Sequence, residues 1–361
     1  MEHPENNEAY KGLKVNSGVT DVPTVNPYLK RARRKTYTVS EFIEGILKGN
    51  ITVLSQAVTL VESAKHEHQV IAQEIIEKCL PFAGQSVRVG ITGVPGAGKG
   101  TSIDVFGMHL LNQGHKLAVL AIDPSSERSK GSILGDKTRM EALSREKNAF
   151  IRPSPSAGSL GGVARKTRET IVLCEAAGFD TVFVETVGVG QSETAVHSMV
   201  DFFLLIQLAG TGDELQGIKR GIMEMADGII INKADGDNIE KAKLAASQFR
   251  NALHLFPPTE SGWFPKVLTY SGYYNLGIKE IWDMVDEYIR FTKKNGYFEY
   301  KRNEQAKYWM YESINDTLRE TFYHNPAVEQ MLASTEQQVL HNEVSSFVAA
   351  KRMIDLFLKN I

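Results

Sequence analysis

Val87-Arg-Val-Gly-Ile-Thr-Gly-Val-Pro-Gly-Ala-Gly-Lys-Gly-Thr101 is the stretch that decides the fold of this chain. It begins with the apolar, β-branched pattern of a buried strand, and a helical pattern starts near Thr101. In the glycine-rich loop between them, backbone N–H groups can surround a phosphate, while the following helix adds the positive end of its dipole. We therefore expect a phosphate-binding loop made of Gly93, Val94, Pro95, Gly96, Ala97, Gly98, Lys99, Gly100 and Thr101, in which Lys99 reaches the β- and γ-phosphates.

The residue after the lysine departs from the pattern usual in phosphate-binding loops. Ser or Thr at that position supplies a hydroxyl ligand to Mg²⁺, whereas this chain has Gly100 followed by Thr101. The order Gly98-Lys-Gly-Thr101 is similar to the loop of adenylate-kinase-like enzymes, so nucleotide binding is still expected. Carboxylates elsewhere must then contribute more to holding magnesium.

Strand-like and helical stretches alternate from Ser86 to about Thr292. The strands are expected at Val87–Thr92, Leu117–Ile122, Phe150–Arg152, Thr181–Val184, Phe202–Leu208, Gly228–Ile231 and Val267–Thr269. Most are too apolar to leave one face of a sheet in water, so helices must cover both faces. The pattern predicts an α/β fold, with a P-loop NTPase domain over residues 86–292 whose central sheet is mostly parallel and flanked by helices.

Three carboxylates are candidate ligands for Mg²⁺ beside the phosphates. Asp123 and Glu185 each end a predicted strand, and Asp136 lies in a glycine-rich loop. Strand ends face the ligand crevice in sheets of this kind. Because Mg²⁺ usually binds one or two carboxylates together with phosphates and water, not all three need to bind it directly.

A switch motif follows the fourth predicted strand. Glu185-Thr-Val-Gly188 resembles the Asp-x-x-Gly switch of GTPases, in which the glycine N–H can sense a γ-phosphate, and Gln191 extends the same turn. Lys219 or Arg220, in the polar segment after the fifth strand, could enter the site like an arginine finger supplied in cis. A solvated helix face is an equally open reading of that segment. Catalysis is thus expected from Lys99, Glu185, Gln191 and Lys219.

A base-recognition motif follows the sixth predicted strand. Its residues are Asn232-Lys-Ala-Asp235. The carboxylate of Asp235 can accept from N1–H and the exocyclic amino group of guanine, which adenine cannot match, while the stem of Lys233 can cover the base. Ser271 and Gly272, after the last strand, can complete the base pocket. The motif predicts selectivity for GTP and GDP.

Composition excludes several classes of protein. The 361 residues suffice for two or three domains, and 41 Lys and Arg against 43 Asp and Glu fit neither a nucleic-acid-binding polycation nor a disordered polyanion. Cys79 and Cys174 are far apart and indicate no disulfide framework or soft-metal site. No apolar run approaches the ~18 residues of a membrane span. We expect a cytoplasmic protein that binds neither nucleic acid nor membrane.

The segments before and after the α/β region lack its alternation of strand-like and helical stretches. Residues 1–37 are predicted to be a flexible arm, residues 38–85 a helical N-terminal unit, and residues 293–361 a helical C-terminal extension. Two apolar stripes mark that extension as two amphipathic helices: Met310, Ile314, Leu318 and Phe322, then Leu340, Val344, Phe347, Ile354 and Leu358. Because the sheet pattern is complete before it, we expect the extension to be separable and to join two subunits in a homodimer. Packing of these helices on their own domain stays open as the alternative.

These motifs together resemble those of the MeaB/ArgK family of P-loop GTPases, whose members include the human methylmalonic aciduria type A protein. The resemblance covers at least residues 86–290, through Gly93–Lys99, Asp123-Pro-Ser-Ser126, Gly131–Met140, Arg152-Pro-Ser-Pro155, Gly158–Ala164, Glu185–Glu193 and Asn232–Asp235. Gly100 and Lys130 depart from it, because family members usually have Ser and Gly at those positions.

The resemblance implies a homodimeric GTPase that uses Mg²⁺, gates the delivery of adenosylcobalamin to methylmalonyl-CoA mutase and protects that enzyme from inactivation. No motif in the sequence identifies this partner. Other functions stay open: a phosphotransferase or kinase-like P-loop enzyme, a nickel-insertion GTPase, or an arginine/ornithine transport-associated ATPase. Asn232–Asp235 argues against the first, and the lack of Cys/His ligand clusters in the sequence argues against the second.

Overall fold

A seven-stranded parallel sheet forms the centre of the computed structural model, which describes residues 37–122, 140–153, 160–186, 192–209 and 220–359. The strands are β1 (Val87–Gly93), β2 (Leu117–Ile122), β3 (Ala149–Arg152), β4 (Thr181–Thr186), β5 (Phe202–Leu208), β6 (Gly228–Asn232) and β7 (Lys266–Thr269). Their order is β3-β2-β4-β1-β5-β6-β7, and each neighbouring pair is parallel. The predicted α/β fold is confirmed. At their carboxyl ends β1, β4 and β6 extend beyond the predicted limits, to Gly93, Thr186 and Asn232.

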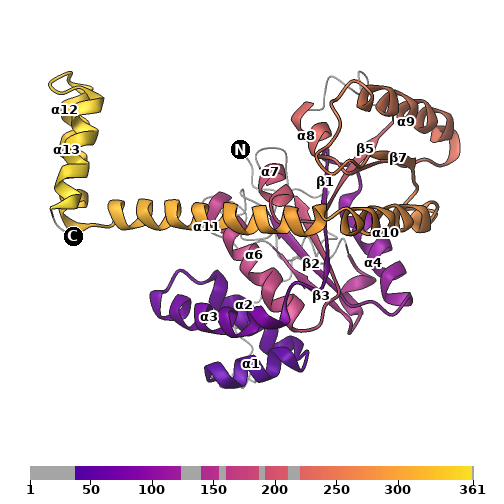
Figure 1. Ribbon diagram of the computed structural model, residues 1–361, viewed down its shortest axis with the longest axis horizontal. Coiled ribbons are helices and arrows are strands. Elements are labelled where there is room, and N and C mark those ends of the chain that lie inside the picture. The colour runs from indigo at the N-terminus through magenta and orange to yellow at the C-terminus, as the bar shows by residue number, and fades with distance from the viewer. Residues whose placement is uncertain (1–36, 123–139, 154–159, 187–191, 210–219, 360–361) are drawn as a thin grey trace, which may run out of the picture. The chain divides into compact units, whose positions relative to one another are not determined.

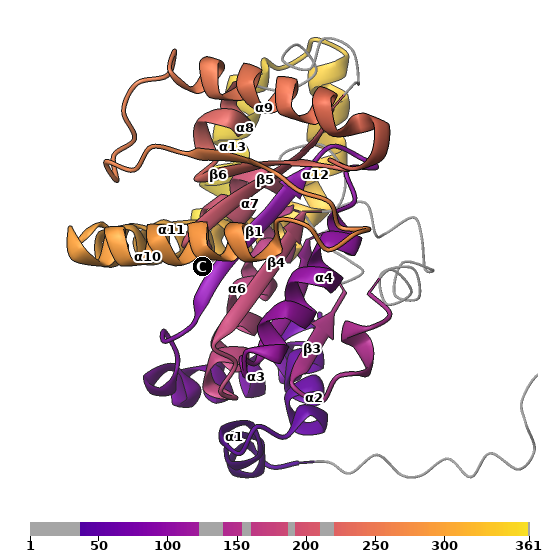
Figure 2. The same ribbon diagram turned by 90° about the vertical axis from the view of Figure 1, so that its right-hand side faces the viewer.

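Helices cover both faces of this sheet (Figures 1 and 2). They are α4 (Lys99–Asn112), α6 (Leu160–Ala176), α7 (Ser192–His197), α8 (Arg220–Met225), α9 (Ile239–Leu253) and α10 (Ile278–Lys294). The helices α4 and α10 share a buried apolar cluster with Val89 and Ile91 of β1. The helices α7 and α9 pack on the opposite face, α7 over Gly90 and α9 over Ile229 and Ile231. Strands buried on both faces explain the continuous apolar runs in the sequence.

Three short helices make up the described N-terminal part: α1 (Val39–Leu47), α2 (Ile51–Glu62) and α3 (His66–Cys79). The side chain of Asn50 begins α2 by accepting hydrogen bonds from the N–H groups of Thr52 and Val53, at 3.0 and 3.2 Å. Both α2 and α3 pack on α6 and so extend the layer on that face of the sheet. The predicted arm, apart from Tyr37, lies outside the described residues.

The described C-terminal region has three helices where the two apolar stripes predicted two. They are α11 (Tyr297–Tyr323), α12 (Pro326–Leu340) and α13 (Ser346–Leu358). Asn325 begins α12 by accepting from the N–H groups of Ala327 and Val328, and Ser345 begins α13 by accepting from that of Val348. The second predicted stripe is therefore divided between α12 and α13, because cap residues interrupt it.

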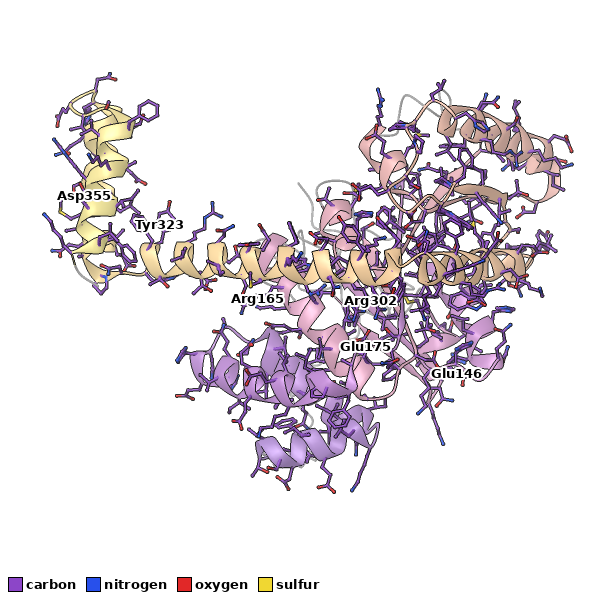
Figure 3. The ribbon with its side chains drawn as sticks, viewed as in Figure 1. Glu146, Arg165, Glu175, Arg302, Tyr323 and Asp355 are labelled. Atoms are coloured by element: carbon purple, nitrogen blue, oxygen red, sulfur yellow. The ribbon has the colours of Figure 1, made fainter. Side chains whose placement is uncertain are left out.

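The first half of α11 packs against the sheet. Phe298 and Trp309 are buried, and Arg302 forms an ion pair with Asp201, which directly precedes β5. Figure 3 shows Arg302 on this part of the helix and Tyr323 at its end. That residues 293–361 are separable stays a prediction, and these turns of α11 pack on the sheet domain of the same chain. None of the described helices combines the length and apolar character needed to cross a membrane.

Candidate functional site

The predicted phosphate-binding loop lies where β1 ends and α4 begins. The strand ends at Gly93, and α4 begins at Lys99 with Gly98 as its N-cap residue in the left-handed conformation, at φ +85°. The N–H of Ala97 donates to the carbonyl of Val94 over 3.1 Å and closes the turn. Lys99 donates from Nζ to the carbonyl of Gly93 over 2.9 Å. The ammonium group therefore lies back over the loop, where a phosphate would neutralise it.

Two glycines of this loop are required by close contacts. A Cβ atom on Gly93 would lie 2.2 Å from the carbonyl oxygen of Ile206 on β5. A Cβ atom on Gly98 would lie 2.6 Å from Nδ2 of Asn232. Since real Cβ atoms do not approach this closely, the loop backbone is pressed against β5 on one side and the end of β6 on the other.

Asn232 joins the base-recognition segment to the phosphate-binding loop. Its Nδ2 donates to the carbonyl of Ala97 over 2.7 Å. Its Oδ1 accepts from the N–H of Lys233 at 2.7 Å and from the N–H of Gly272 at 3.3 Å. One buried side chain thus fixes three segments that are far apart in sequence.

Lys233 has an unusual backbone conformation for a residue with a side chain. Its φ is +59°, in the left-handed region that favours glycine. Asn238 donates from Nδ2 to its carbonyl over 2.8 Å, which stabilises this conformation. Such strain persists where the surrounding structure imposes it, and it concentrates at functional sites. The side chain of Lys233 is exposed and free to lie over a bound base.

Asp235 is oriented by a residue from the far side of the predicted base pocket. The hydroxyl of Ser271, itself fully buried, donates a short hydrogen bond to Oδ2 of Asp235. The N–H of Ala234 donates to the carbonyl of Tyr270 over 2.9 Å, so the two segments run side by side. The carboxylate keeps further acceptor capacity for two donors of a base.

Glu185 lies at the carboxyl end of β4, in register with Ile91 of β1 and Ala121 of β2. Its side chain is buried. Beside it, Thr186 donates from its hydroxyl to that of Thr92 over 2.9 Å, and this pair was not identified from the sequence. A hard carboxylate one strand away from the phosphate-binding loop fits the coordination preference of Mg²⁺.

Several predicted site residues lie outside the described part of the chain. They are Asp123 and Asp136, Gly188 and Gln191, and Lys219. Among the described residues no group of three or more His, Cys, Asp or Glu side chains is arranged to hold a metal ion. The alternative residue Arg220 is described: it begins α8, pairs with Glu224 at 3.0 Å and lies over the ring of Phe256.

Gly100 and Thr101 occupy the first turn of α4. Gly100 is half-buried and Thr101 is exposed. Because the residue that follows Lys99 is a glycine, that position has no side-chain hydroxyl. Gly100, which replaces the usual Ser or Thr, therefore lies in a strand-loop-helix segment of the kind that the sequence predicts.

Comparisons with known proteins match most of this chain. The family model described as methylmalonyl-CoA mutase-associated GTPase MeaB matches residues 54–327. A Caulobacter vibrioides protein described as a GTPase is 50% identical over 312 residues, which cover 86% of this chain and 95% of that protein. GTPase ArgK of Escherichia coli is 44% identical over 308 residues, which cover 85% of this chain and 93% of that protein.

A eukaryotic protein and a solved structure extend the comparison. The mitochondrial methylmalonic aciduria type A homolog of Mus musculus is 44% identical over 329 residues, covering 88% of this chain and 79% of that protein. A crystal structure described as LAO/AO transport system kinase matches with a TM-score of 0.71 and 35% identity, covering 90% of this chain and all of that one. These matches cover the phosphate-binding and base-recognition segments described above.

Proposed function

The chain belongs to the MeaB family of methylmalonyl-CoA mutase-associated GTPases, and on this premise we propose that it is a guanine-nucleotide switch that gates adenosylcobalamin delivery to methylmalonyl-CoA mutase and protects that enzyme. The observation that carries the nucleotide part is the contact of Asn232 with Ala97, which connects base recognition with phosphate binding. The proposal that methylmalonyl-CoA mutase is the partner is supported by the family's name and by the name of the mouse relative.

We assign the parts of the nucleotide to the residues as follows. Residues 93–101 bind the phosphates, with Lys99 bridging the β- and γ-phosphates as charge develops during hydrolysis. Asn232, Lys233, Asp235, Ser271 and Gly272 form the base pocket. Glu185, Gln191 and Lys219 are proposed to take part in hydrolysis, and Gly188 to sense the γ-phosphate.

Magnesium would be held by Glu185 with one or both of Asp123 and Asp136. A bound Mg²⁺ neutralises negative charge between the β- and γ-phosphates. Glu185 fits this role because it is a buried carboxylate at the carboxyl end of β4, beside β1. Its burial at this strand end holds the carboxylate beside the predicted phosphate-binding loop.

The test of the proposed function is GTP turnover with and without purified cobalamin-dependent methylmalonyl-CoA mutase. We expect the rate per molecule of this protein to change when the mutase is added, and GTP and GDP to alter the stability of the complex differently. An unrelated cobalamin-free enzyme at the same concentration is the control. A turnover rate unaffected by the mutase, with no complex detected in either nucleotide, would contradict the partner assignment.

A second candidate function is favoured by one comparison. The solved structure at 35% identity is described as a transport system kinase, and Gly98–Thr101 has the order found in adenylate-kinase-like loops. Transfer of the γ-phosphate to a protein or small acceptor, measured with labelled GTP and ATP, would distinguish a kinase from a hydrolase.

The C-terminal helices are proposed to join two copies of the chain. A groove of about 870 Å³ runs between the end of α11, α12 and α13, and its apolar lining includes Leu318, Phe322, Leu332, Met353 and Ile354. Leu318 and Ile354 are more than half exposed. Removing residues 325–361 keeps α11, so sedimentation should show a folded monomer. A dimer of unchanged stability would place the interface elsewhere.

We also propose a cytoplasmic location. Cys79 and Cys174 are both free thiols buried in the protein, and burial raises the pKa of each above its ordinary value. Such thiols are unreactive. This arrangement needs no oxidising compartment.

A further inference from the structure

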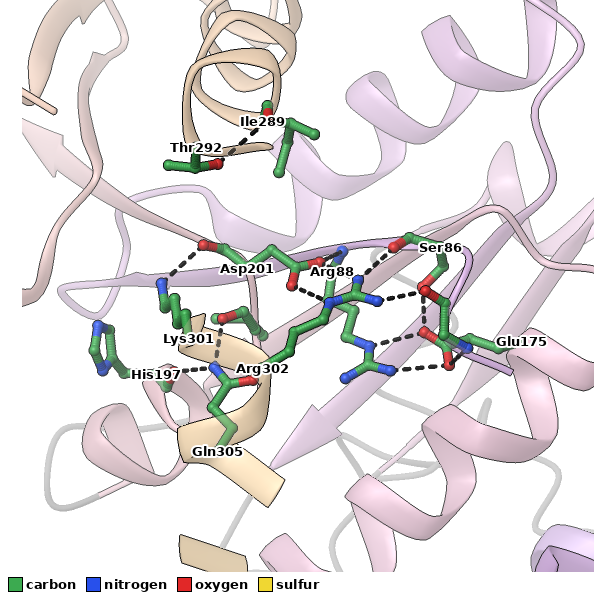
Figure 4. A network of polar contacts seen from close by, with 12 residues as sticks. Ser86, Arg88, Glu175, His197, Asp201, Ile289, Thr292, Lys301, Arg302 and Gln305 are labelled. Atoms are coloured by element: carbon green, nitrogen blue, oxygen red, sulfur yellow. Dashed lines mark hydrogen bonds and ion pairs between the residues drawn. The ribbon is translucent and has the colours of Figure 1, made fainter. Parts of the chain in front are cut away.

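The helix α11 lies along the turn that joins α7 to β5, residues 197–201, as Figure 4 shows. The four side chains that reach this turn come from one face of the helix, at positions 301, 302, 305 and 309. That spacing places side chains on neighbouring turns above one another. The contact therefore extends over more than two turns of α11.

Two of these side chains donate to three backbone carbonyls at and just after the end of α7. Gln305 donates from Nε2 to the carbonyl of Val200 over 2.8 Å and to that of His197 over 3.4 Å. Trp309 donates from Nε1 to the carbonyl of Ser198 over 3.0 Å. The last carbonyls of a helix have no partner within that helix, so α11 supplies the donors that α7 lacks.

The orientation of the Gln305 amide is determined by these contacts. Both of its partners are carbonyl oxygens, which can only accept, so the NH₂ group must face them. Gln305 is buried, and its Oε1 has no hydrogen-bond partner among the described residues. A buried amide that leaves one atom unsatisfied is costly, which indicates that the contact serves more than surface coverage.

Charged side chains keep α11 in this position. Arg302 pairs with Asp201 through two hydrogen bonds of 2.7 and 2.8 Å and also donates to the carbonyl of Ser86 over 2.6 Å. Lys301 donates to the carbonyl of Asp201 over 2.8 Å. The α7–β5 turn and the segment entering β1 are thereby held by the same turn of α11.

The helix α7 depends on such support. It has only six residues, and an isolated helix of that length is unstable in water. It packs tightly on β1, because a Cβ atom on Gly90 would lie 2.8 Å from Cγ1 of Val196. At its start Ser192 and Glu193 are buried, directly after the motif that begins at Glu185.

We infer that Gln305 and Trp309 are positioning residues for GTP hydrolysis, because they hold the end of the short helix whose start follows the switch motif. Neither residue touches the nucleotide in this account. They act through α7, whose first residue, Ser192, follows the switch motif in the sequence. The inference rests on the proposed use of Glu185, Gly188 and Gln191 in hydrolysis.

The test uses the full chain with Gln305→Met, Trp309→Phe and the matched control Lys307→Ala. Met keeps the length of Gln without its donors, Phe keeps a ring without the indole N–H, and Lys307 is an exposed residue of the same helix paired with Glu304. We expect kcat for GTP to fall about 2- to 10-fold in each of the first two variants, with KM nearly unchanged, as the loss of a typical hydrogen bond allows. Lys307→Ala should match the unmodified protein.

If Gln305 and Trp309 had a structural role alone, their substitution would lower the melting temperature but would not lower kcat while leaving KM nearly unchanged. The inference is overturned if kcat stays at the unmodified value in Gln305→Met and Trp309→Phe, or if Lys307→Ala lowers it equally. Hydrogen exchange gives a second readout: the amides of Ser198 and Met199, bonded to Thr194 and Val196, should exchange faster in Gln305→Met. Unchanged exchange would also overturn it. An unmodified protein that hydrolyses no GTP would contradict the proposed function and the inference with it, and the exchange result would then show only whether Gln305 holds the end of α7.

Discussion

Asn232 donates a hydrogen bond from Nδ2 to the backbone carbonyl of Ala97 over 2.7 Å, across 135 positions of sequence. The contact means that the base-recognition segment and the phosphate-binding loop cannot move independently without leaving a buried amide unpaired. Lys233 and Gly98 take left-handed conformations on either side of it. The parts of the site that the structure describes are thus held to one another by hydrogen bonds of the chain itself.

Asp235→Asn should change the base preference. The new amide presents a donor where guanine also donates, so GTP affinity should fall by about 10- to 150-fold and xanthosine triphosphate should bind better. Calorimetric titration with both nucleotides measures this. Asp237→Asn is the matched control, because that aspartate is exposed two residues away. Retained GTP preference in Asp235→Asn would show that another group reads the base.

Gly98→Ala should weaken GTP binding by about 10-fold or more, because the new methyl group would displace Asn232 and break its bond to Ala97. Gly114→Ala is the control: Gly114 has a similar φ of +92°, but nothing lies within 4 Å of its missing Cβ atom. Both variants should lose some stability through backbone strain, but only the first should lose nucleotide affinity. Equal affinity in the two variants would contradict the steric argument.

Gly100→Ser should lower the magnesium concentration needed for half-maximal GTP turnover. The serine hydroxyl would replace a water ligand and reduce the ordering needed around the ion. Titrating magnesium at saturating GTP in Gly100→Ser, Glu185→Gln and the unmodified protein separates metal binding from a general change in the loop. Glu185→Gln should need more magnesium. If Gly100→Ser leaves both the magnesium dependence and the rate unchanged, another ligand already occupies that position.

Arg302→Met should reduce the free energy of unfolding by about 3–5 kcal/mol, because Asp201 would lose its buried charged partner. Urea unfolding of the full chain measures the change. Arg319→Met makes the same substitution on an exposed part of α11 and should have little effect. A loss below about 1 kcal/mol would mean that α11 contributes little to the stability of the sheet.

Acid should destabilise the protein partly through His197. Burial, and to a smaller degree the charge of Lys301, lowers the pKa of His197 to about 3, whereas the unfolded chain keeps an ordinary value of about 6.5. Below pH 6.5 the unfolded state binds a proton that the folded state does not. The free energy of unfolding therefore decreases as the pH is lowered, by up to about 1.4 kcal/mol per pH unit.

His197→Phe removes this titration and keeps a ring near Phe203, which packs edge-on against the histidine. Between pH 7 and pH 5 the variant should lose about 2 kcal/mol less than the unmodified protein. His341→Gln, at an exposed histidine, is the control. Parallel pH profiles for His197→Phe and the unmodified protein would show that His197 titrates normally in the folded state.

The strands could be predicted because burial on both faces leaves an uninterrupted apolar run, as in Phe202–Leu208. The loop of residues 93–101 and the Asn232–Asp235 segment could be singled out as candidate sites because phosphate binding and base recognition require particular residues at short spacing. The contact between Gly98 and Asn232 could not, since nothing local to either residue indicates the other.

The packing of α11 was missed for a physical reason. Lys301, Arg302 and Gln305 have the polarity of a solvent-facing surface, yet they are matched by carbonyls and a carboxylate about 100 or more positions away. Polar residues with distant partners resemble solvated ones in a sequence. The division of the second apolar stripe was missed because Ser345 acts as a helix cap, which the apolar period does not reveal.

The most direct test of the central claim is the affinity of the unmodified protein for GTP, GDP and ATP, measured by calorimetry in one buffer with magnesium. A site in which Asn232 joins the base pocket to the phosphate-binding loop predicts that GTP and GDP bind, and that ATP binds about 100-fold more weakly or not at all, because Asp235 finds no matching donors on adenine. Equal affinity for GTP and ATP would contradict the account.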